Sequence, residues 1–252
     1  MKSMKLFFTL TAYLITISLM AAPPRPFRKL LPEEKQLIKK YSRSIDKKDG
    51  LYHVLILTDQ GHMVVKLFNE TPLHRDNFIE KVRSGFYDSL LFHRVINSFM
   101  IQGGDPTSKK TTPGQTVGNG SAPGDRIPAE FRTAQGIYHK RGALAAARDN
   151  NPEKASSNCQ FYIVQRKTWR VGQLDSTAVF RRLTLNDDQK KLYTTVGGTP
   201  HLDGGYTVFG ELEFGFEVLD KIAAVKTNRS DQPEQDVRMR LFLLNELPFR
   251  KK

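Results

Sequence analysis

Short apolar runs with a two-residue period dominate the chain from Leu51 onward, and they predict strands. Residues 63–68 follow a turn at residues 59–61 and place Met63, Val65 and Leu67 on one face of such a strand. A last strand is expected over residues 237–244 and another over residues 158–164. Many short strands separated by turn residues are typical of a mainly β protein.

Two segments instead show helical spacing and lie far apart in the chain. The first begins at Pro72, with Thr71 as the expected N-cap and Gly85 as the expected stop. The second covers about residues 216–223. Their apolar faces are formed by Phe78, Ile79, Val82 and Phe86 in the first and by Phe216, Leu219, Ile222 and Ala223 in the second. We therefore expect an all-β barrel, in the main, whose ends are covered by two helices.

The N-terminal part has a different character. Residues 1–5 are basic, residues 6–20 carry no charge, and Ala21 and Ala22 precede a proline-rich stretch, which is the layout of a signal peptide over residues 1–21. Cleavage after Ala21 would leave a periplasmic protein, with a membrane-anchored or extracellular protein as the alternative. Residues 22–49 are polar and basic and predict a tether or a loosely packed helix that starts at Pro32.

Composition excludes several classes of site. The formal net charge is +13, but basic and acidic residues are mixed along the chain, so we expect surface charge rather than a specific nucleic-acid site. The single cysteine, Cys159, cannot form an internal disulfide, and we expect it to be a small buried residue. The six histidines show no spacing typical of a zinc site, so no metal or cofactor is expected. We expect a monomer.

Residues 92–106 read Phe-His-Arg-Val-Ile-Asn-Ser-Phe-Met-Ile-Gln-Gly-Gly-Asp-Pro and form the most informative stretch. Alternation along a strand would place Arg94 on one surface beside Phe99, Met100 and Gln102. The surface would be an apolar concave patch with one fixed cation and one amide, and without a nucleophile. Such a patch suits a reaction that needs positioning and charge stabilisation.

This run resembles the central motif of the cyclophilin-type peptidyl-prolyl cis-trans isomerases, and two further blocks agree with it in family order. Residues 142–148 with residues 157–163 resemble the family's Met-Ala-(Asn or Arg) and Ser-Gln-Phe-Phe-Ile stretches, and residues 201–210 resemble its Leu-Asp-Gly block. The resemblance implies a closed eight-stranded antiparallel barrel over residues 50–252 in a bacterial, exported isomerase. It also implies proline-containing polypeptides as partners and assistance to protein folding as the role.

The resemblance also implies the site residues. Arg94 takes the position of the catalytic guanidinium, and Gln102 and Gln160 take those of the polar residues that hold substrate and arginine. The positions that bind substrate are occupied by Phe99, Met100, Ala147, Arg148, Tyr162, His201, Leu202 and Tyr206.

Four of these positions depart from the best-known members. Arg148 replaces asparagine, Tyr162 replaces phenylalanine and adds a hydroxyl, and Tyr206 replaces histidine. His201 replaces a tryptophan that is associated with cyclosporin binding, so we expect weakened binding of that drug. An imidazole at this place is also expected to titrate near neutral pH.

Residues 166–200 form an insertion relative to the short members of the family. Residues 183–193 predict an amphipathic helix within it, which could be a lid beside the groove or a surface decoration. Trp169 lies in the insertion and does not replace the missing tryptophan. Two functions remain open: an isomerase, and a module on the same barrel that binds proline-containing segments without turnover. The presence of Arg94, Gln102 and Gln160 favours the isomerase, because binding alone does not need the guanidinium.

Overall fold

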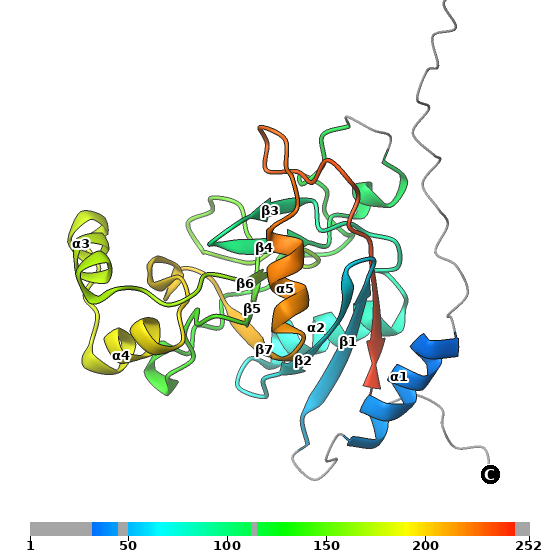
Figure 1. The fold of residues 1–252 in the computed structure, drawn as a ribbon, viewed down its shortest axis with the longest axis horizontal. Coiled ribbons are helices and arrows are strands. Elements are labelled where there is room, and N and C mark those ends of the chain that lie inside the picture. Colours follow the sequence, from blue (N-terminus) through cyan, green and yellow to red (C-terminus); the bar gives the residue numbers. More distant parts are fainter. Residues whose placement is uncertain (1–31, 45–49, 112–114, 245–252) are drawn as a thin grey trace, which may run out of the picture.

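The computed structural model describes residues 32–44, 50–111 and 115–244, and its described part is built on one antiparallel sheet of eight strands (Figure 1). Residues 1–31, which include the predicted signal peptide, lie outside this description, as do residues 45–49, 112–114 and 245–252. The strands are β1 (Tyr52–Thr58), β2 (Gly61–Leu67), β3 (Arg94–Ile96), β4 (Met100–Gly103), β5 (Ala143–Ala146), β6 (Phe161–Val164), β7 (Val208–Phe214) and β8 (Met239–Leu243).

The sheet is curled, and its two edge strands are not paired with each other. The strand order is β3-β4-β6-β5-β7-β2-β1-β8, so β3 and β8 are the edges. Residues just before β3 close the gap: Leu91 bridges Arg238, and the Phe92 N–H donates to the Val237 carbonyl at 2.9 Å. The expected mainly β fold of eight antiparallel strands is confirmed as a curled half-barrel, and backbone contacts between residues 89–92 and 237–239 link its two edges.

Alternation along the strands gives the barrel two distinct apolar surfaces. In β4, β5 and β6, Ile101, Leu144 and Phe161 point to the interior, where they join the main core. Their neighbours Met100, Ala145 and Tyr162 point outward into a second cluster. The second cluster is buried by loops rather than by another sheet, and it carries the candidate site.

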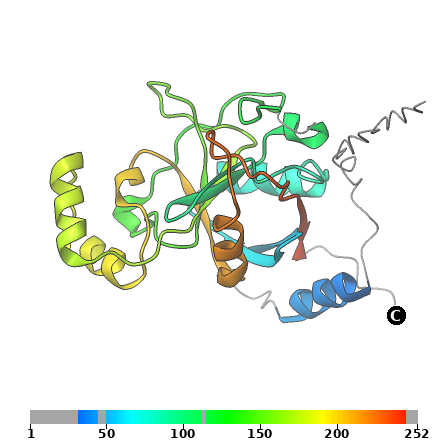
Figure 2. The same cartoon turned by 45° about the horizontal axis from the view of Figure 1, so that its top comes forward.

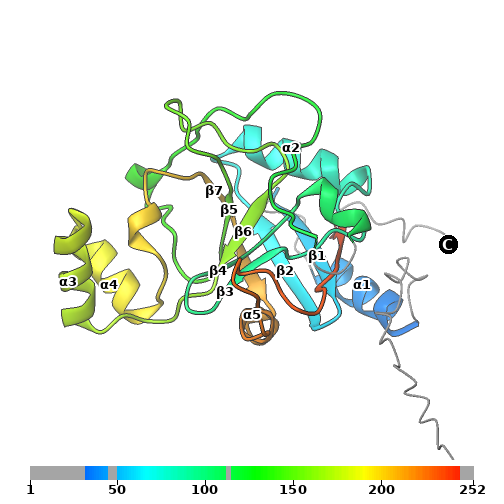
Figure 3. The ribbon, with the colours of Figure 1, turned by 90° about the horizontal axis from the view of Figure 1, so that it is seen from above.

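Two helices cover opposite sides of the curled sheet, as predicted (Figure 3). They are α2 (Pro72–Arg83) and α5 (Phe216–Ala223), and their apolar faces pack into the main core. Gly85 adopts a positive φ of 67° just beyond α2, which ends the helix as expected. The prediction for Thr71 is wrong in one respect, because its side chain caps nothing. The carboxylate of Glu130 instead accepts hydrogen bonds from the N–H groups of Leu73 and His74, at 3.2 and 3.0 Å.

Residues 32–44 form a helix, α1 (Pro32–Ser44), outside the barrel. Ile38 is buried in a small cluster with Leu55, Leu57 and Val64 of β1 and β2. None of the described helices is both long and apolar enough to cross a bilayer.

The insertion holds two helices that project from the barrel, α3 (Val171–Arg181) and α4 (Asp187–Thr195) (Figures 1 and 2). The helix predicted over 183–193 begins later than expected, because Asn186 and Gln189 form a capping box at that point. Helix α3 was not predicted. It buries only Leu174, so its sequence carries no amphipathic pattern.

Three short 3₁₀ helices complete the described structure: η1 (Pro106–Lys110), η2 (Thr133–Gln135) and η3 (Pro200–Leu202). The strand expected over 158–164 starts only at Phe161. The Ser157 hydroxyl accepts hydrogen bonds from the N–H groups of Cys159 and Gln160, and this turn delays the strand.

Candidate active site

The Arg94 motif folds as a hairpin rather than as the single strand implied by its alternation. Residues 97–99 turn the chain between β3 and β4, with Ser98 at a φ of 60°. Arg94 pairs with Gln102 and Ile96 with Met100. Because cross-strand partners share a face, the hairpin still places Arg94 beside Met100 and Gln102 on the outer surface.

An apolar cluster on this outer face, here called the outer cluster, contains most of the residues expected to bind substrate. Met100 and Tyr162 form its floor and are almost fully buried. Phe99, Leu202 and Tyr206 are partly exposed around them. The outer cluster consists of Phe68, Ile96, Phe99, Met100, Ile137, Ala143, Ala145, Ala147, Tyr162, Val164, Leu202, Tyr206 and Val208.

The two glutamines form a chain of hydrogen bonds at the polar edge of this cluster. Gln102 donates through Nε2 to the Oε1 atom of Gln160 at 3.0 Å. Gln160 donates in turn to the carbonyls of Gly118 and Gly120, at 3.0 and 2.9 Å. The amide of Gln160 is thus committed to the protein, and it holds Gln102 in place.

Asp105 secures the loop on which Gln160 depends. Its carboxylate accepts from the N–H groups of Gly118, Gly120 and Thr107. These hydrogen bonds outweigh the effect of burial and lower the pKa of Asp105. Gly120 lies so close to the carboxylate that an added Cβ would approach Oδ1 to 2.1 Å, which explains the glycine.

Arg94 remains accessible. Its side chain is 44% exposed, and its Nε atom lies 3.5 Å from the Oδ2 atom of Asp231. Asp231 belongs to the loop between α5 and β8 and also accepts the N–H of Val95 through its carbonyl at 2.8 Å. The site therefore offers a cation beside an apolar surface, with its two terminal amino groups not engaged in this contact.

The hydroxyl of Tyr162 does not point to an open pocket. It forms a 3.0 Å hydrogen bond with Nε2 of His139, and the two rings are nearly parallel. Tyr206 packs edge-on against both rings. Arg148 lies over the ring of Tyr206 at 4.7 Å and donates to the Gly205 carbonyl at 2.8 Å. The rings of Tyr162 and Tyr206 are thus fixed by contacts with His139 and Arg148.

His201 lies on η3 at the rim, where its ring stacks on Phe99 with centroids 5.7 Å apart. Burial, aided by the nearby Arg181 guanidinium, lowers the pKa of His201 to about 4. The expectation that it titrates near neutral pH is therefore wrong, because the imidazole is partly desolvated.

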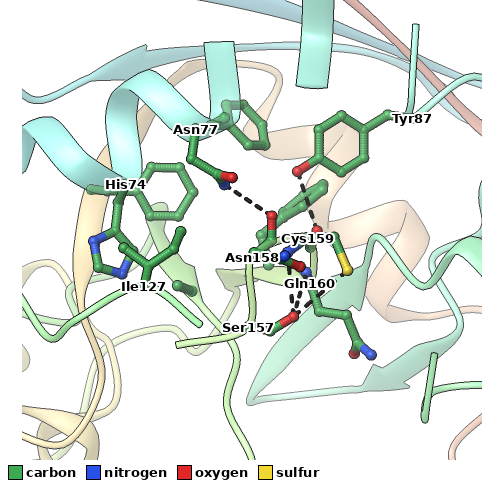
Figure 4. A pocket seen from close by; sticks show the side chains of 12 residues that line it. His74, Asn77, Tyr87, Ile127, Ser157, Asn158, Cys159 and Gln160 are labelled. Atoms are coloured by element: carbon green, nitrogen blue, oxygen red, sulfur yellow. Dashed lines mark hydrogen bonds between the residues drawn. The ribbon is translucent and has the colours of Figure 1, made fainter. Parts of the chain in front are cut away.

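A small cavity under α2 lies on the other side of the segment that presents Gln160 (Figure 4). Asn77 donates to the Asn158 carbonyl at 2.9 Å and Tyr87 to the Cys159 carbonyl at 3.2 Å, while the amide of Gln160 points away from both. These contacts fix the backbone of the segment. Cys159 is buried, as expected, and burial raises the pKa of its thiol, which makes it a poor nucleophile.

Ser156, His74 and Glu130 have the spacing of a hydrolase triad, yet they are buried. His74 joins the Ser156 hydroxyl at 2.9 Å and the Glu130 carboxylate at 2.7 Å. Each is at most 5% exposed, and the carboxylate also caps α2, so the set stabilises the fold. No group of three or more possible metal ligands occurs within residues 32–44, 50–111 and 115–244.

Comparison with known families agrees with this geometry. Residues 53–242 match the family described as cyclophilin type peptidyl-prolyl cis-trans isomerase/CLD. The chain belongs to the cyclophilin family. It is a cyclophilin-type peptidyl-prolyl cis-trans isomerase, as the three sequence blocks had indicated.

Curated relatives carry the same activity in their names. This cyclophilin is 38% identical over 187 residues to a bifunctional phosphatase/peptidyl-prolyl cis-trans isomerase of Streptococcus pyogenes. The match covers 73% of this chain but only 37% of the length of that relative. It is 36% identical over 192 residues to a peptidyl-prolyl cis-trans isomerase of Staphylococcus aureus, covering 75% of the chain and 89% of the relative.

Solved structures also resemble this cyclophilin. A cyclophilin-type isomerase of Cryptosporidium parvum matches with a TM-score of 0.54 and 26% identity, covering 77% of this chain and 97% of its own. A second structure of that protein, solved in the presence of the dipeptide Ala-Pro, matches with a TM-score of 0.53 and 26% identity over 76% of this chain and 98% of its own.

Sequence reasoning missed three residues that contact side chains of the candidate site. They are Asp231, which faces Arg94, and His139 and Asp203, which lie behind Tyr162. Asp203 was visible as part of the Leu-Asp-Gly block, but its partners come from distant segments. No local pattern marks either Asp231 or His139.

Proposed function

We propose that this cyclophilin accelerates the rotation of X–Pro bonds in exported proteins, with Arg94 as its catalytic guanidinium and the outer cluster as its proline pocket. The observation that carries the proposal is the pairing of Arg94 with Gln102 in the β3–β4 hairpin, next to Met100. This arrangement joins a cation, an amide and an apolar floor on one accessible face.

The chemistry of the bond explains why such a face suffices. Amide resonance creates a barrier of about 18–20 kcal/mol, and the twisted transition state loses that resonance and returns a lone pair to the prolyl nitrogen. A guanidinium is permanently charged and can donate to this nitrogen only once it becomes pyramidal. The interaction is therefore stronger in the transition state than in the ground state, which is the condition for catalysis.

The apolar residues have a complementary role in the proposal. Phe99, Met100, Tyr162 and Leu202 hold the proline ring and exclude water that would stabilise the planar amide. Ala147 and Arg148 receive the peptide backbone. Gln102, with Gln160 behind it, orients the polar edge. His201 and Tyr206 form the rim.

A protease-coupled assay on a prolyl peptide tests this function. Arg94→Ala is expected to lower kcat/KM by about 10²-fold or more, equivalent to about 2.7 kcal/mol. Arg75→Ala serves as a matched control, because Arg75 is an ion-paired arginine on α2 and should leave kcat/KM unchanged. Full activity of folded Arg94→Ala would overturn the mechanism, and a wild type that binds prolyl peptides without turnover would favour a binding module.

Export to the periplasm, the action on exported clients and the monomeric state are also proposals. The basic start, the uncharged run over residues 6–20 and Ala21 support cleavage after Ala21. N-terminal sequencing of the protein from its native host tests cleavage, and an intact Met1 would contradict it.

A further inference from the structure

Helix α4 of the insertion reaches the site through one buried carboxylate. Asp203 follows η3 directly, next to Leu202 of the outer cluster. Its Oδ2 atom accepts hydrogen bonds from the Tyr193 hydroxyl at 2.5 Å and from Nε2 of Gln189 at 3.1 Å. Both donors belong to α4, so the insertion and the site share this contact.

The second oxygen of Asp203 fixes a histidine. Oδ1 lies 2.9 Å from the backbone nitrogen of His139 and 2.9 Å from its Nδ1 atom. An ionised carboxylate only accepts hydrogen bonds, so Nδ1 carries the proton. In the neutral imidazole Nε2 is then an acceptor, and the tautomer of His139 is set by Asp203.

The acceptor at Nε2 determines where the Tyr162 hydroxyl points. The two atoms lie 3.0 Å apart, and with Nε2 as the acceptor the hydroxyl is the donor. The Tyr162 and His139 rings lie 6.1 Å apart at an interplanar angle of 14°. The polar end of Tyr162 is thereby satisfied away from the outer cluster. Its ring serves as an apolar wall, although a tyrosine stands where phenylalanine is usual.

Burial makes each link of this chain costly to break. Tyr193, His139 and Tyr162 are exposed by only 0%, 1% and 4%. A buried donor or acceptor left without a partner costs about 1–3 kcal/mol. Burial also raises the pKa of both tyrosines, so that they remain protonated donors.

We propose that the insertion positions the proline pocket: Tyr193 and Gln189 of α4 act through Asp203 and His139 to hold the ring of Tyr162. The inference rests on the proposed function of the outer cluster as the proline pocket. It assigns the insertion a role as a support of the pocket wall, rather than as a lid or a surface decoration.

Separate determination of kcat and KM tests this role. Tyr193→Phe removes only the hydroxyl at one end of the chain. A pocket wall contacts the proline ring both before and during rotation. Loosening of the Tyr162 ring should therefore raise KM about 3- to 10-fold and leave kcat within about 2-fold of the wild type. A merely destabilised protein would instead show a lower apparent kcat and an unchanged KM. Thr195→Ala, on the exposed face of α4, is the matched control and should change neither constant.

A double-mutant cycle distinguishes coupling from coincidence. Tyr162→Phe removes the hydroxyl at the other end, so the ring no longer depends on His139. In that background, Tyr193→Phe should leave KM within about 2-fold. The hydrogen bonds that connect the two tyrosines run through Asp203 and His139. If the two substitutions acted independently, their effects on the free energy of binding would add. An equal rise of KM in both backgrounds, or no rise in either, would overturn the proposal.

A measurement on the wild type keeps the test valid if Tyr193→Phe does not fold. Nitrogen NMR should find His139 in the Nδ1–H tautomer, and the opposite tautomer would overturn the proposal. Arg94→Ala separates the two levels of the argument. If that variant loses turnover while Tyr193→Phe leaves KM unchanged, only the role of the insertion fails. If it retains turnover, the proposed function itself fails.

Discussion

The Nε atom of Arg94 lies 3.5 Å from the Oδ2 atom of Asp231, which comes from the loop that precedes the last strand. The contact is made by the inner nitrogen of the guanidinium and not by its two terminal nitrogens. Both side chains are nearly half exposed, so the pair adds little to stability, about 0–1 kcal/mol. We expect the pair to act by orienting Arg94 instead.

Replacement of Asp231 should therefore affect turnover more than folding. Asp231 adopts a φ of 60°, a conformation that asparagine tolerates, so Asp231→Asn keeps the loop. We expect kcat/KM to fall about 5-fold, equivalent to about 1 kcal/mol, because the guanidinium loses its fixed direction. The melting temperature should shift by less than about 4 °C. An unchanged kcat/KM in the coupled assay would show that Asp231 does not orient Arg94.

The elements that sequence predicted correctly are those with local signals. Apolar alternation marks β2, and the apolar spacing with Pro72 and Gly85 marks α2. The motif around Arg94 gave the correct face, although Ser98 breaks it into a hairpin. Each of these signals lies within a few residues of what it determines.

What sequence reasoning missed depends on partners from distant segments. Glu130 caps α2 from more than fifty residues away, and Tyr193 meets Asp203 only because the insertion folds back. Helix α3 was missed for another reason: it projects from the barrel and buries only Leu174, so no amphipathic pattern was selected. The long-range contacts of Glu130 and Tyr193, for their part, leave no periodic pattern in the sequence.

Cyclosporin binding should be weaker than in members with tryptophan at position 201. The His201 ring stacks on Phe99 at the rim, so a larger side chain there would extend the apolar surface and add an N–H donor. We expect His201→Trp to tighten inhibition by about 5- to 150-fold, equivalent to about 1–3 kcal/mol. Turnover of small prolyl peptides should change less, because the floor formed by Met100 and Tyr162 is intact. Equal inhibition constants for both proteins in the same assay would exclude a role of this position.

Glu130 should contribute strongly to stability. Its buried carboxylate accepts two backbone N–H groups of α2 and the Nδ1–H of His74. Glu130→Gln places amide hydrogens against these donors, and we expect the free energy of unfolding to fall by about 2–4 kcal/mol. Urea unfolding measures the change. The exposed Glu153→Gln is the control, and an equal midpoint for both variants would contradict the capping role.

Buried neutral histidines should make stability depend on pH in the acidic range. His93 is 3% exposed, and its burial lowers the pKa of the imidazole to about 4. The nearby Asp105 carboxylate raises this pKa, but its effect is smaller than that of burial. The unfolded chain keeps the ordinary value of 6.5 and therefore binds a proton first as the pH falls. The contribution of neutral His93 to the free energy of unfolding should thus be fully present above pH 6.5 and should decrease between about pH 6.5 and 4.

The difference between 6.5 and about 4 corresponds to about 3 kcal/mol for His93 alone. The test compares the slope of unfolding free energy against pH in the wild type and in His93→Gln, which cannot titrate. The variant should show a shallower slope in this window, whatever its absolute stability. A residual slope should persist, because burial also lowers the pKa of His74 and His201. Parallel curves for the two proteins would mean that His93 is not the neutral buried group that its surroundings require.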